Sequence, residues 1–449
     1  MNIDFFSNVF NENIAQTAIV YKEEEISYAE LIQKIAYWQS ILSTKSIAPG
    51  DIVAINGDFT PNAISILFAL IENNNIIVPF NFQQKIKNEK KIEISCASKS
   101  ISVDANDNVI FNTHENSNSH PFYEKLRAIN HPGLVLFTSG TSGEPKAAVH
   151  DFINLLEKFK TRKKSLRTLN FLLFDHWGGL NTMFHTLSNG GVVLALNDRH
   201  PQAICAFIEK QKIELLPASP TFLNLLIISE AYKNYDLSSL KLITYGTEPM
   251  PQFTLEKIKQ IFPDVKLQQT YGLIELGVLR SKSKSNDSLW VKIGGEGFQT
   301  RVVNGLLEIK AASAMMGYLN APSPFTEDGW FKTDDQVDVD GEYFKIRGRK
   351  TEIINVGGEK VYPAEVENTL LEIPFVKDCV VYGVDNIITG KTVFADVEIK
   401  ADYDAELARK EMRMYCLGHL SKFKVPSRII IVKAISYSDR FKKIRKTDG

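Results

Sequence analysis

The sequence predicts an α/β fold in which a large N-terminal lobe precedes a small α+β lobe. Between about residues 50 and 290, short apolar runs alternate with helical patterns, which is typical of parallel strands joined by helices. Beyond that point, Asn304-Gly305 and Asp340-Gly341 each lie between strand-like runs and indicate hairpins. The chain has 449 residues, more than one average domain needs. We therefore expect a large lobe of parallel α/β sheets that ends in a β-rich subdomain, followed by the small lobe.

The first expected element of the large lobe is a helix that begins after Ser27. Ser27 and Glu30 have the spacing of a capping box. Apolar residues then recur at helical spacing, at Leu31, Ile35, Trp38 and Leu42. Further along the chain we expect strands at 52–55, 191–196, 213–217 and 242–245, and a helix at 202–212. Residues 83–130 are rich in Lys, Asn and Ser, and are interpreted as a loop-rich insertion.

The small lobe is expected to begin near residues 348–351. We place the boundary so that 1–348 form the large domain and 349–449 the small one. Within the small domain we expect strands at 376–382, 393–399 and 428–432, and a helix within 405–420.

Charge and cysteine content exclude several classes of protein. The chain has 52 basic and 53 acidic residues and a net charge of -1, which argues against binding to nucleic acid or to a membrane surface. The four cysteines are far apart and form no zinc or disulfide pattern, so a reduced, cytoplasmic setting is expected. No signal-peptide pattern is visible, and no apolar run approaches the ~20 residues of a membrane span.

The strongest chemical signal is the glycine- and hydroxyl-rich segment at 138–146. It follows an apolar run and ends in a lysine, and its residues are Thr138, Ser139, Gly140, Thr141, Ser142, Gly143, Glu144, Pro145 and Lys146. Glycines let the backbone approach an anion, while N–H groups, hydroxyls and an ammonium supply donors and charge. The segment is not a Walker A loop, because Pro145 replaces a required Gly. We expect a loop that closes over phosphates; the alternative is an ordinary surface loop.

This loop resembles the phosphate loop of the adenylate-forming superfamily, which includes acyl- and aryl-CoA ligases, peptide-synthetase adenylation domains and luciferases. Further motifs follow in the family's order: Tyr271-Gly272-Leu273-Ile274-Glu275, Gly329-Trp330-Phe331-Lys332-Thr333-Asp334-Asp335, Gly348-Arg349, Asn355-Val356-Gly357-Gly358 and Pro363-Ala364-Glu365-Val366-Glu367. The resemblance extends from about residue 28 to 445 and is closest to the acyl- and aryl-CoA ligase branch.

The resemblance implies a ligase with two half-reactions. A carboxylic acid reacts with ATP to give an acyl-adenylate and pyrophosphate, with Mg²⁺ as the cofactor. A pantetheine thiol, CoA by preference, then displaces AMP. Two alternatives stay open: a stand-alone adenylation enzyme that loads an acyl carrier protein with an acyl group or amino acid, and a catalytically weakened homologue that only binds nucleotide.

The resemblance also assigns roles to individual residues. The 138–146 loop, with Lys146, would hold the β- and γ-phosphates, and Glu275 would bind Mg²⁺. Residues expected to line the adenine and acyl sites are Gly246, Thr247, Glu248, Tyr271 and Gly272. Asp335 would accept hydrogen bonds from the ribose hydroxyls, and Arg349 would add donors. The acyl pocket is expected near Trp177, Ala218, Tyr245, Thr247 and Leu276.

Three further assignments concern catalysis and the thiol. Lys442 would act at the α-phosphate during adenylation, since Ser436-x-Ser438-x-x-Phe441-Lys442-x-x-Arg445 matches the spacing of the family's terminal motif. His176 would gate the carboxylate, and Gly358 would line the thiol path after the small lobe rotates. Lys443 is the nearest rival to Lys442. Asp175 could instead pair with a substrate ammonium, a role that we rank below the CoA-ligase reading.

The sequence departs from the family's motifs at four positions. Ile274 replaces a Thr, while Ala147, Asp334 and Phe441 each replace a Gly, the change at Ala147 being mild. A lost hydroxyl and restricted backbone angles at these positions predict an active but altered enzyme.

Overall fold

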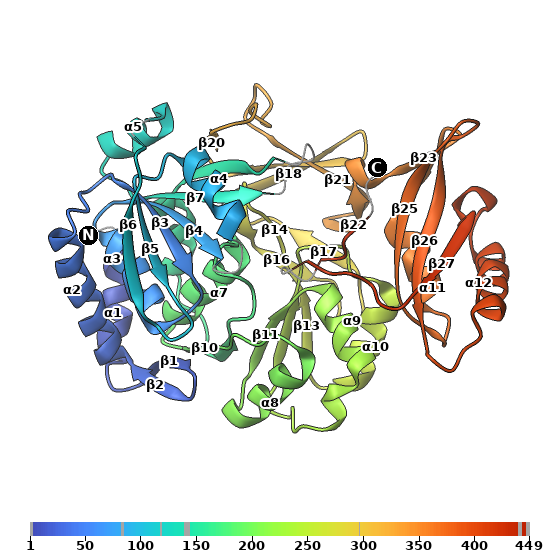
Figure 1. Cartoon of the computed structure of the whole chain (residues 1–449), viewed down its shortest axis with the longest axis horizontal. Helices are drawn as coiled ribbons and strands as arrows, with labels where there is room; N and C mark the ends of the chain where they lie inside the picture. The colour runs from blue at the N-terminus through green and yellow to red at the C-terminus, as the bar shows by residue number, and fades with distance from the viewer. Residues whose placement is uncertain are drawn as a thin grey trace.

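Two seven-stranded sheets form the framework of the large lobe in the computed structural model, which describes residues 3–81, 85–116, 119–138, 144–295, 297–438 and 442–445 (Figure 1). The first sheet has the order β20-β8-β7-β4-β3-β5-β6. Its strands are β3 (Ile52–Gly57), β4 (Ile76–Asn81), β5 (Lys99–Val103), β6 (Val109–Thr113), β7 (Gly133–Thr138), β8 (Lys146–Asp151) and β20 (Gly317–Tyr318). Strands β5, β3, β4 and β7 run parallel, and antiparallel strands close both edges.

The second sheet has the order β13-β12-β11-β9-β10-β1-β2. Its strands are β1 (Thr17–Tyr21), β2 (Glu24–Ser27), β9 (Arg167–Leu169), β10 (Val192–Ala195), β11 (Leu215–Ala218), β12 (Leu242–Tyr245) and β13 (Lys266–Gln269). All neighbours are parallel except the edge strand β2. Ligands of open parallel sheets bind at the carboxyl ends of the strands, so the residues that follow β11, β12 and β13 are well placed for a site.

Helices pack between and around these two sheets. The bounds are α1 (Asp4–Glu12), α2 (Tyr28–Thr44), α3 (Pro61–Glu72), α4 (Lys85–Ser95), α5 (Pro121–Ala128), α6 (Phe152–Leu156), α7 (Trp177–Leu187), α8 (Pro201–Gln211), α9 (Pro220–Ser229) and α10 (Gln252–Ile261), with 3-10 turns η1 (Glu157–Lys160) and η2 (Ala231–Lys233). The largest core cluster joins side chains of both sheets with those of α1, α2, α3 and α7. Helix α3 is buried nearly all round, as expected for a helix between two sheets.

A β-rich subdomain closes the large lobe. Its strands are β14 (Tyr271–Leu273), β15 (Gly277–Leu279), β16 (Ser281–Ser283), β17 (Trp290–Ile293), β18 (Phe298–Val303), β19 (Leu306–Ala311), β21 (Phe331–Asp340) and β22 (Tyr343–Arg349). The two predicted hairpins are confirmed, because β18 pairs with β19 and β21 with β22 across the expected Gly turns.

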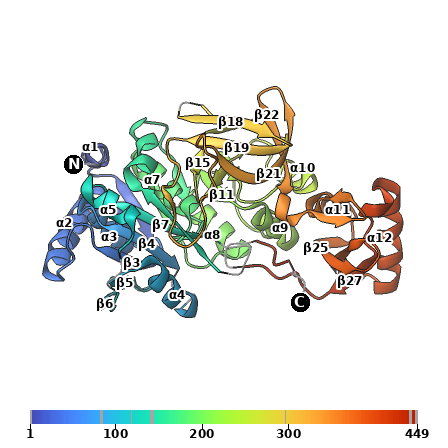
Figure 2. The ribbon, with the colours of Figure 1, turned by 90° about the horizontal axis from the view of Figure 1, so that it is seen from above.

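The small lobe is an α+β unit at one end of the molecule (Figure 2). It contains η3 (Lys350–Glu352), β23 (Ile354–Val356), β24 (Glu359–Val361), α11 (Pro363–Leu371), β25 (Val376–Asn386), β26 (Gly390–Ile399), α12 (Ala405–His419), η4 (Lys422–Lys424) and β27 (Arg428–Val432). It has its own apolar core, against which Phe253 of α10 packs. The N–H of Phe253 also donates to Asn368 Oδ1 at 3.2 Å, so α10 and α11 form a contact between the lobes.

Most sequence expectations for the fold are confirmed, and one is wrong. The α/β class is confirmed, and Ser27 and Glu30 form a complete capping box at the start of α2. Residues 83–130 are not loop-rich, because their described part contains α4, β5, β6 and α5. Within the described ranges, no helix combines the length and the apolar character needed to cross a bilayer.

Candidate active site

Tyr271, Asp335 and Arg349 form a polar cluster at the boundary of the β-rich subdomain, in which Tyr271 and Asp335 are buried and Arg349 is exposed. Asp335 on β21 is the register partner of Arg349 on β22, and the Arg349 Nε lies 3.6 Å from Asp335 Oδ1. The Tyr271 hydroxyl donates to Asp335 Oδ2 at 2.5 Å. Burial raises the pKa of Asp335, although Arg349 and Tyr271 oppose this change. Because a buried carboxylate is poorly solvated, hydrogen-bond donors are needed to stabilise the charged form of Asp335.

Glu275 and Lys146 lie beside the same cluster, linked by Tyr318. The Tyr318 hydroxyl donates to Glu275 Oε1 at 2.6 Å, and Lys146 Nζ lies 5.6 Å from the centre of the Tyr318 ring. The pKa of Arg349 is raised overall. Partial burial acts to lower this pKa, but the negative charges of Asp335 and Glu275 outweigh the effect of burial. Two cations and two carboxylates from distant segments are thus brought together.

The ends of the predicted phosphate loop are held by a hairpin. Thr138 at the end of β7 is the register partner of Lys146 at the start of β8. Asn320 fixes this base, because its Oδ1 accepts from the Ala147 N–H and its Nδ2 donates to the Pro145 carbonyl, both at 3.0 Å. Ser139, Gly140, Thr141, Ser142 and Gly143 lie outside the described residues. The anchored base places Lys146 beside the ring of Tyr318, whose hydroxyl bonds to Glu275.

Two glycines allow the backbone to pack closely at this site. A Cβ on Gly246 would lie 2.5 Å from Thr270 Oγ1, and one on Gly272 would lie 2.8 Å from the Gly277 carbonyl. Gly246 follows β12, and Gly272 lies in β14. A side chain at either position would displace the backbone.

Thr247 and Glu248 continue the segment that follows β12. Thr247 has a φ of +75°, an unusual angle for a residue with a branched side chain. Glu248 Oε1 accepts from the Thr221 N–H, at the start of α9, at 2.8 Å. Burial raises the pKa of Glu248, against the contributions of Thr221, Lys442 and Lys443. The large-lobe carboxylate Glu248 therefore faces the basic C-terminal segment.

Glu248→Gln is expected to raise the melting temperature slightly at neutral pH, by about 1–2 °C. A carboxyl whose folded-state pKa is raised disfavours folding wherever it is ionised. The gain should be present above that raised pKa and should vanish as the pH falls below the ordinary Glu value of about 4.3. Thermal unfolding of both proteins between pH 4 and 8 measures it; a lower melting temperature for the variant at pH 7 would contradict the assignment.

His176 lies at the start of α7 and caps it. Its Nδ1 accepts from the Gly178 N–H at 3.0 Å, which fixes the imidazole at the end of the helix. The next residue, Trp177, is buried, and its indole nitrogen would lie 3.1 Å from a Cβ placed on Gly277. The predicted gate and the predicted wall of the acyl pocket therefore share one helix end, opposite β15.

Asp175 has a cation of the protein beside it. Lys91 Nζ lies 3.9 Å from Asp175 Oδ2, and both side chains are buried. The Lys91 ammonium also lies 5.6 Å and 5.7 Å from the ring centres of Phe80 and Phe137. A carboxylate with an internal ammonium partner is poorly suited to bind the ammonium of an amino acid. This arrangement favours the CoA-ligase interpretation of the segment.

The C-terminal lysines differ sharply in their environments. Lys443 is buried and forms an ion pair with Asp378 at 2.7 Å. Lys442 is exposed, and both lysines act against the rise in the pKa of Glu248 that burial causes. Gly358 lies apart from this group, in the exposed turn between β23 and β24, where its N–H donates to Asn355 Oδ1 at 2.9 Å. Of the two candidate lysines, Lys443 is held in an ion pair within the small lobe and Lys442 is exposed to solvent.

Three of the four departures from the family motifs lie in the described residues. Ala147 is buried in the core of the first sheet. Ile274 packs against the cores on either side of it, so apolar contacts replace the expected hydroxyl. Asp334 has a φ of +60°, the conformation that a Gly would adopt without strain. Phe441 lies outside the described residues.

Tyr318 and Asn320 were missed by sequence reasoning. They lie in and just after the two-residue strand β20, which pairs with β8 at Ala148. So short a strand has no periodicity to detect, and a Gly-Tyr pair in an irregular stretch is its only signal.

Comparison with known proteins places the chain in a family. The description "AMP-binding enzyme" matches residues 6–304, and "AMP-binding enzyme C-terminal domain" matches 365–442. The chain is 25% identical to the indoleacetate–CoA ligase of Aromatoleum aromaticum (96% of this chain, 94% of the relative). It is 26% identical to a feruloyl-CoA synthase of an Amycolatopsis species (94% and 92%).

Solved structures share the fold. One is the anthranilate CoA ligase AuaEII in complex with anthranoyl-AMP, with a TM-score of 0.83 and 17% identity over 98% of this chain and 95% of that one. Another is ATP-bound MatB from Rhodopseudomonas palustris, with a TM-score of 0.79 and 21% identity over 98% and 97%. The resemblance inferred from the motifs is confirmed, and the chain belongs to the AMP-binding enzyme family.

Proposed function

We propose that this protein activates a carboxylic acid with ATP, giving an acyl-adenylate and pyrophosphate, and then transfers the acyl group to the thiol of CoA. The observation that carries the proposal is the convergence of Lys146, Tyr318, Glu275, Arg349 and Asp335 from four separated segments, the last two residues being paired on the β21–β22 hairpin. Two cations could balance the phosphate charge of a bound nucleoside triphosphate, and two carboxylates could bind its ribose hydroxyls and metal ion. A loop anchored at its base could close over the phosphates.

The chemistry explains why such a site is needed. A carboxylate is a poor electrophile, because oxide is a poor leaving group. Joining the carboxylate to the α-phosphate of ATP makes AMP the leaving group, but it brings two anions together in the transition state. The protein must therefore supply positive charge and orientation and keep water out.

The residues present fit ATP and Mg²⁺. Asp335 is buried, has a raised pKa and would accept from the ribose hydroxyls, while Gly246 and Gly272 allow the close backbone packing around this site. Lys146 and Arg349 would balance phosphate charge. Glu275 offers the carboxylate oxygen that Mg²⁺ prefers, and the ion, when bound, would neutralise phosphate oxygens. His176 and Trp177 would define the approach of the acid.

We propose an aromatic acid as the substrate class to test first. Trp177 and Tyr245 are buried at the expected acyl pocket, where they suit a small or aromatic acid better than a long straight chain. Two relatives are named for indoleacetate and ferulate, and one structural neighbour for anthranilate.

Two domains, 1–348 and 349–449, would serve the two half-reactions. The small lobe has a core of its own, and α10–α11 forms a limited contact between the lobes. We propose that it rotates near Thr351 after adenylation, so that Lys442 leaves the site and the Gly358 turn enters it to line the thiol path. Lobe movements of this kind often limit turnover.

ATP–pyrophosphate exchange over a panel of acids tests the proposal. The panel should contain indoleacetate, ferulate, anthranilate, short and long aliphatic acids, dicarboxylates and amino acids. Exchange with at least one aromatic acid is expected, followed by thioester formation on addition of CoA. Transfer only to a phosphopantetheinylated carrier protein would replace CoA with a carrier. Exchange with none, despite ATP binding, would support the weakened nucleotide-binding homologue.

A further inference from the structure

The C-terminal segment forms a small antiparallel arm around Lys442. Ser438 N–H donates to the Lys442 carbonyl at 2.8 Å, and Ile444 N–H donates to the Ser436 carbonyl at 3.0 Å. Side chains of an extended segment alternate between its two faces. Accordingly, Lys442 and Ile444 are exposed, while the side chains of Lys443 and Arg445 are largely buried against the small lobe.

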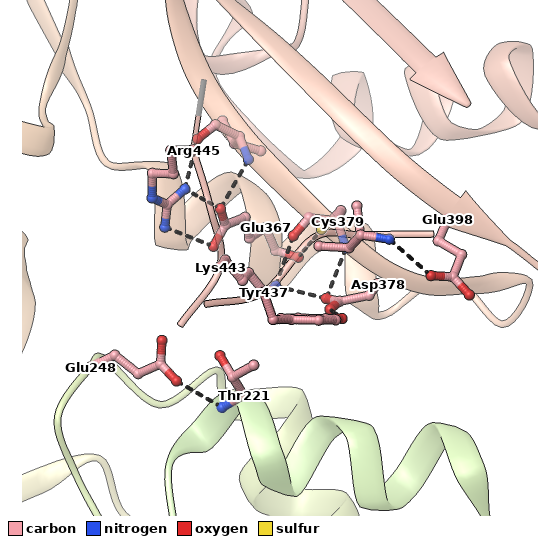
Figure 3. Close-up of polar contacts among 11 residues, drawn as sticks. Thr221, Glu248, Glu367, Asp378, Cys379, Glu398, Tyr437, Lys443 and Arg445 are labelled. Atoms are coloured by element: carbon pink, nitrogen blue, oxygen red, sulfur yellow. Dashed lines mark hydrogen bonds and ion pairs between the residues drawn. The ribbon is translucent and has the colours of Figure 1, made fainter. Parts of the chain in front are cut away.

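Asp378 holds the first buried cation. Asp378 is completely buried on β25, and its Oδ1 lies 2.7 Å from Lys443 Nζ. The same ammonium donates to the Cys379 carbonyl at 2.7 Å. The Tyr437 hydroxyl, from the other side of the arm, donates to Asp378 Oδ2. One carboxylate thus ties both sides of the arm to β25 (Figure 3).

Glu367 holds the second buried cation. Glu367 on α11 is buried and forms an ion pair with Arg445. The guanidinium also donates to the Val381 carbonyl at 2.7 Å, and Glu367 Oε1 accepts from the Val381 N–H at 2.9 Å. In Figure 3 this pair lies beside the Lys443 pair, with Glu248 on the facing surface of the large lobe. The backbone is therefore fixed one and three residues after Lys442.

We infer that Asp378 and Glu367 are positioning residues. By holding Lys443 and Arg445, they set the direction in which the Lys442 side chain points away from the small lobe. The inference rests on the proposed function, because it matters for catalysis only if Lys442 acts in adenylation. Lysine is a point charge on a flexible stem, so its useful position depends on where its Cα is held. Breaking a buried pair leaves an uncompensated charge, which would release the arm.

The first test compares the two half-reactions in Arg445→Met and Glu367→Gln. Both variants remove the charge pair, and the Gln amide oxygen can still accept from the Val381 N–H. The rate of adenylation should fall by about tenfold or more, because release of the arm would displace Lys442. A displacement of about 1 Å near the reacting atoms can slow a reaction by that factor or more. Thioester formation from preformed acyl-adenylate should change by less than about twofold. Lys410→Met, an exposed lysine on α12, is the control and should change neither rate.

Equal losses in both half-reactions, or no loss in adenylation, would overturn the inference. Melting temperatures, measured alongside, identify a variant that is merely unfolded, and Arg445→Lys keeps a charge at the position. Partial recovery of adenylation in Arg445→Lys is expected if charge pairing with Glu367 holds the arm.

A second measurement does not depend on activity. A brief pulse of an acetylating N-hydroxysuccinimide ester, read by peptide mass spectrometry, should modify Lys442 many-fold faster than Lys443 in the wild type. Arg445→Met should make Lys443 several-fold more reactive. Equal labelling of the two lysines in the wild type would refute the inference that the two ion pairs hold the arm. If the labelling is as expected but the protein exchanges pyrophosphate with no acid, the proposed function is refuted, and the inference that the ion pairs hold the arm still stands.

Discussion

Replacing Lys442 with alanine is expected to slow acyl-adenylate formation by about 10²–10³-fold, the cost of removing one preorganised charge from a developing anion. Lys442 is exposed on the small-lobe arm, and its charge acts on Glu248 of the large lobe. Thioester formation from preformed acyl-adenylate should stay within about threefold of the wild type, since Lys442 leaves the site before that step in the proposed mechanism.

Pyrophosphate exchange and single-turnover thioester formation measure the two half-reactions separately. Lys433→Ala, an exposed lysine just after β27, is the matched control and should leave both unchanged. If Lys442→Ala slowed the two half-reactions equally, Lys442 would not be specific to adenylation.

Glu275→Gln is expected to lower adenylation by about 10²-fold and to raise the Mg²⁺ concentration needed for half-maximal rate. The change keeps the size of the side chain and removes the charge that suits a hard cation. Tyr318→Phe removes only the hydroxyl that donates to Glu275 at 2.6 Å. It should cause a smaller loss, of about tenfold, because ligand-orienting hydrogen bonds contribute that much.

Magnesium titrations of the adenylation rate distinguish these effects. A Glu275→Gln enzyme with an unchanged Mg²⁺ requirement would show that Glu275 does not hold the ion. A Tyr318→Phe enzyme indistinguishable from the wild type would show that the Tyr318 contact is not needed in the working site.

Local patterns predicted much of the fold. The predicted strands at 242–245 and 428–432 coincide with β12 and β27, and the helix within 405–420 is α12. These elements have regular apolar spacing, so the signal lies within a few residues. Helix α4 was missed because it is rich in Lys. Lys91 is buried there beside Phe80, and also beside Phe137 and Asp175, which are distant in sequence.

Site residues could be predicted where they lie in contiguous motifs. They could not be predicted where contacts between distant segments determine the environment of the side chain. Sequence spacing predicted Lys442 as the catalytic lysine, with Lys443 as its nearest rival. The environments of the two lysines depend on Asp378, 65 residues before Lys443, which binds Lys443, while Lys442 lies on the outer face. Tyr318 was unpredicted for the same reason, because its importance comes from Glu275, 43 residues away.

The central claim is that a carboxyl oxygen becomes bonded to the α-phosphorus of ATP. An acid accepted in pyrophosphate exchange should be prepared with both carboxyl oxygens as ¹⁸O and turned over with ATP and CoA. The account predicts that the AMP released carries one ¹⁸O atom per molecule, because the attacking oxygen stays on phosphorus when the thiol displaces AMP. AMP without ¹⁸O, or ADP and phosphate as the products, would contradict activation through an acyl-adenylate.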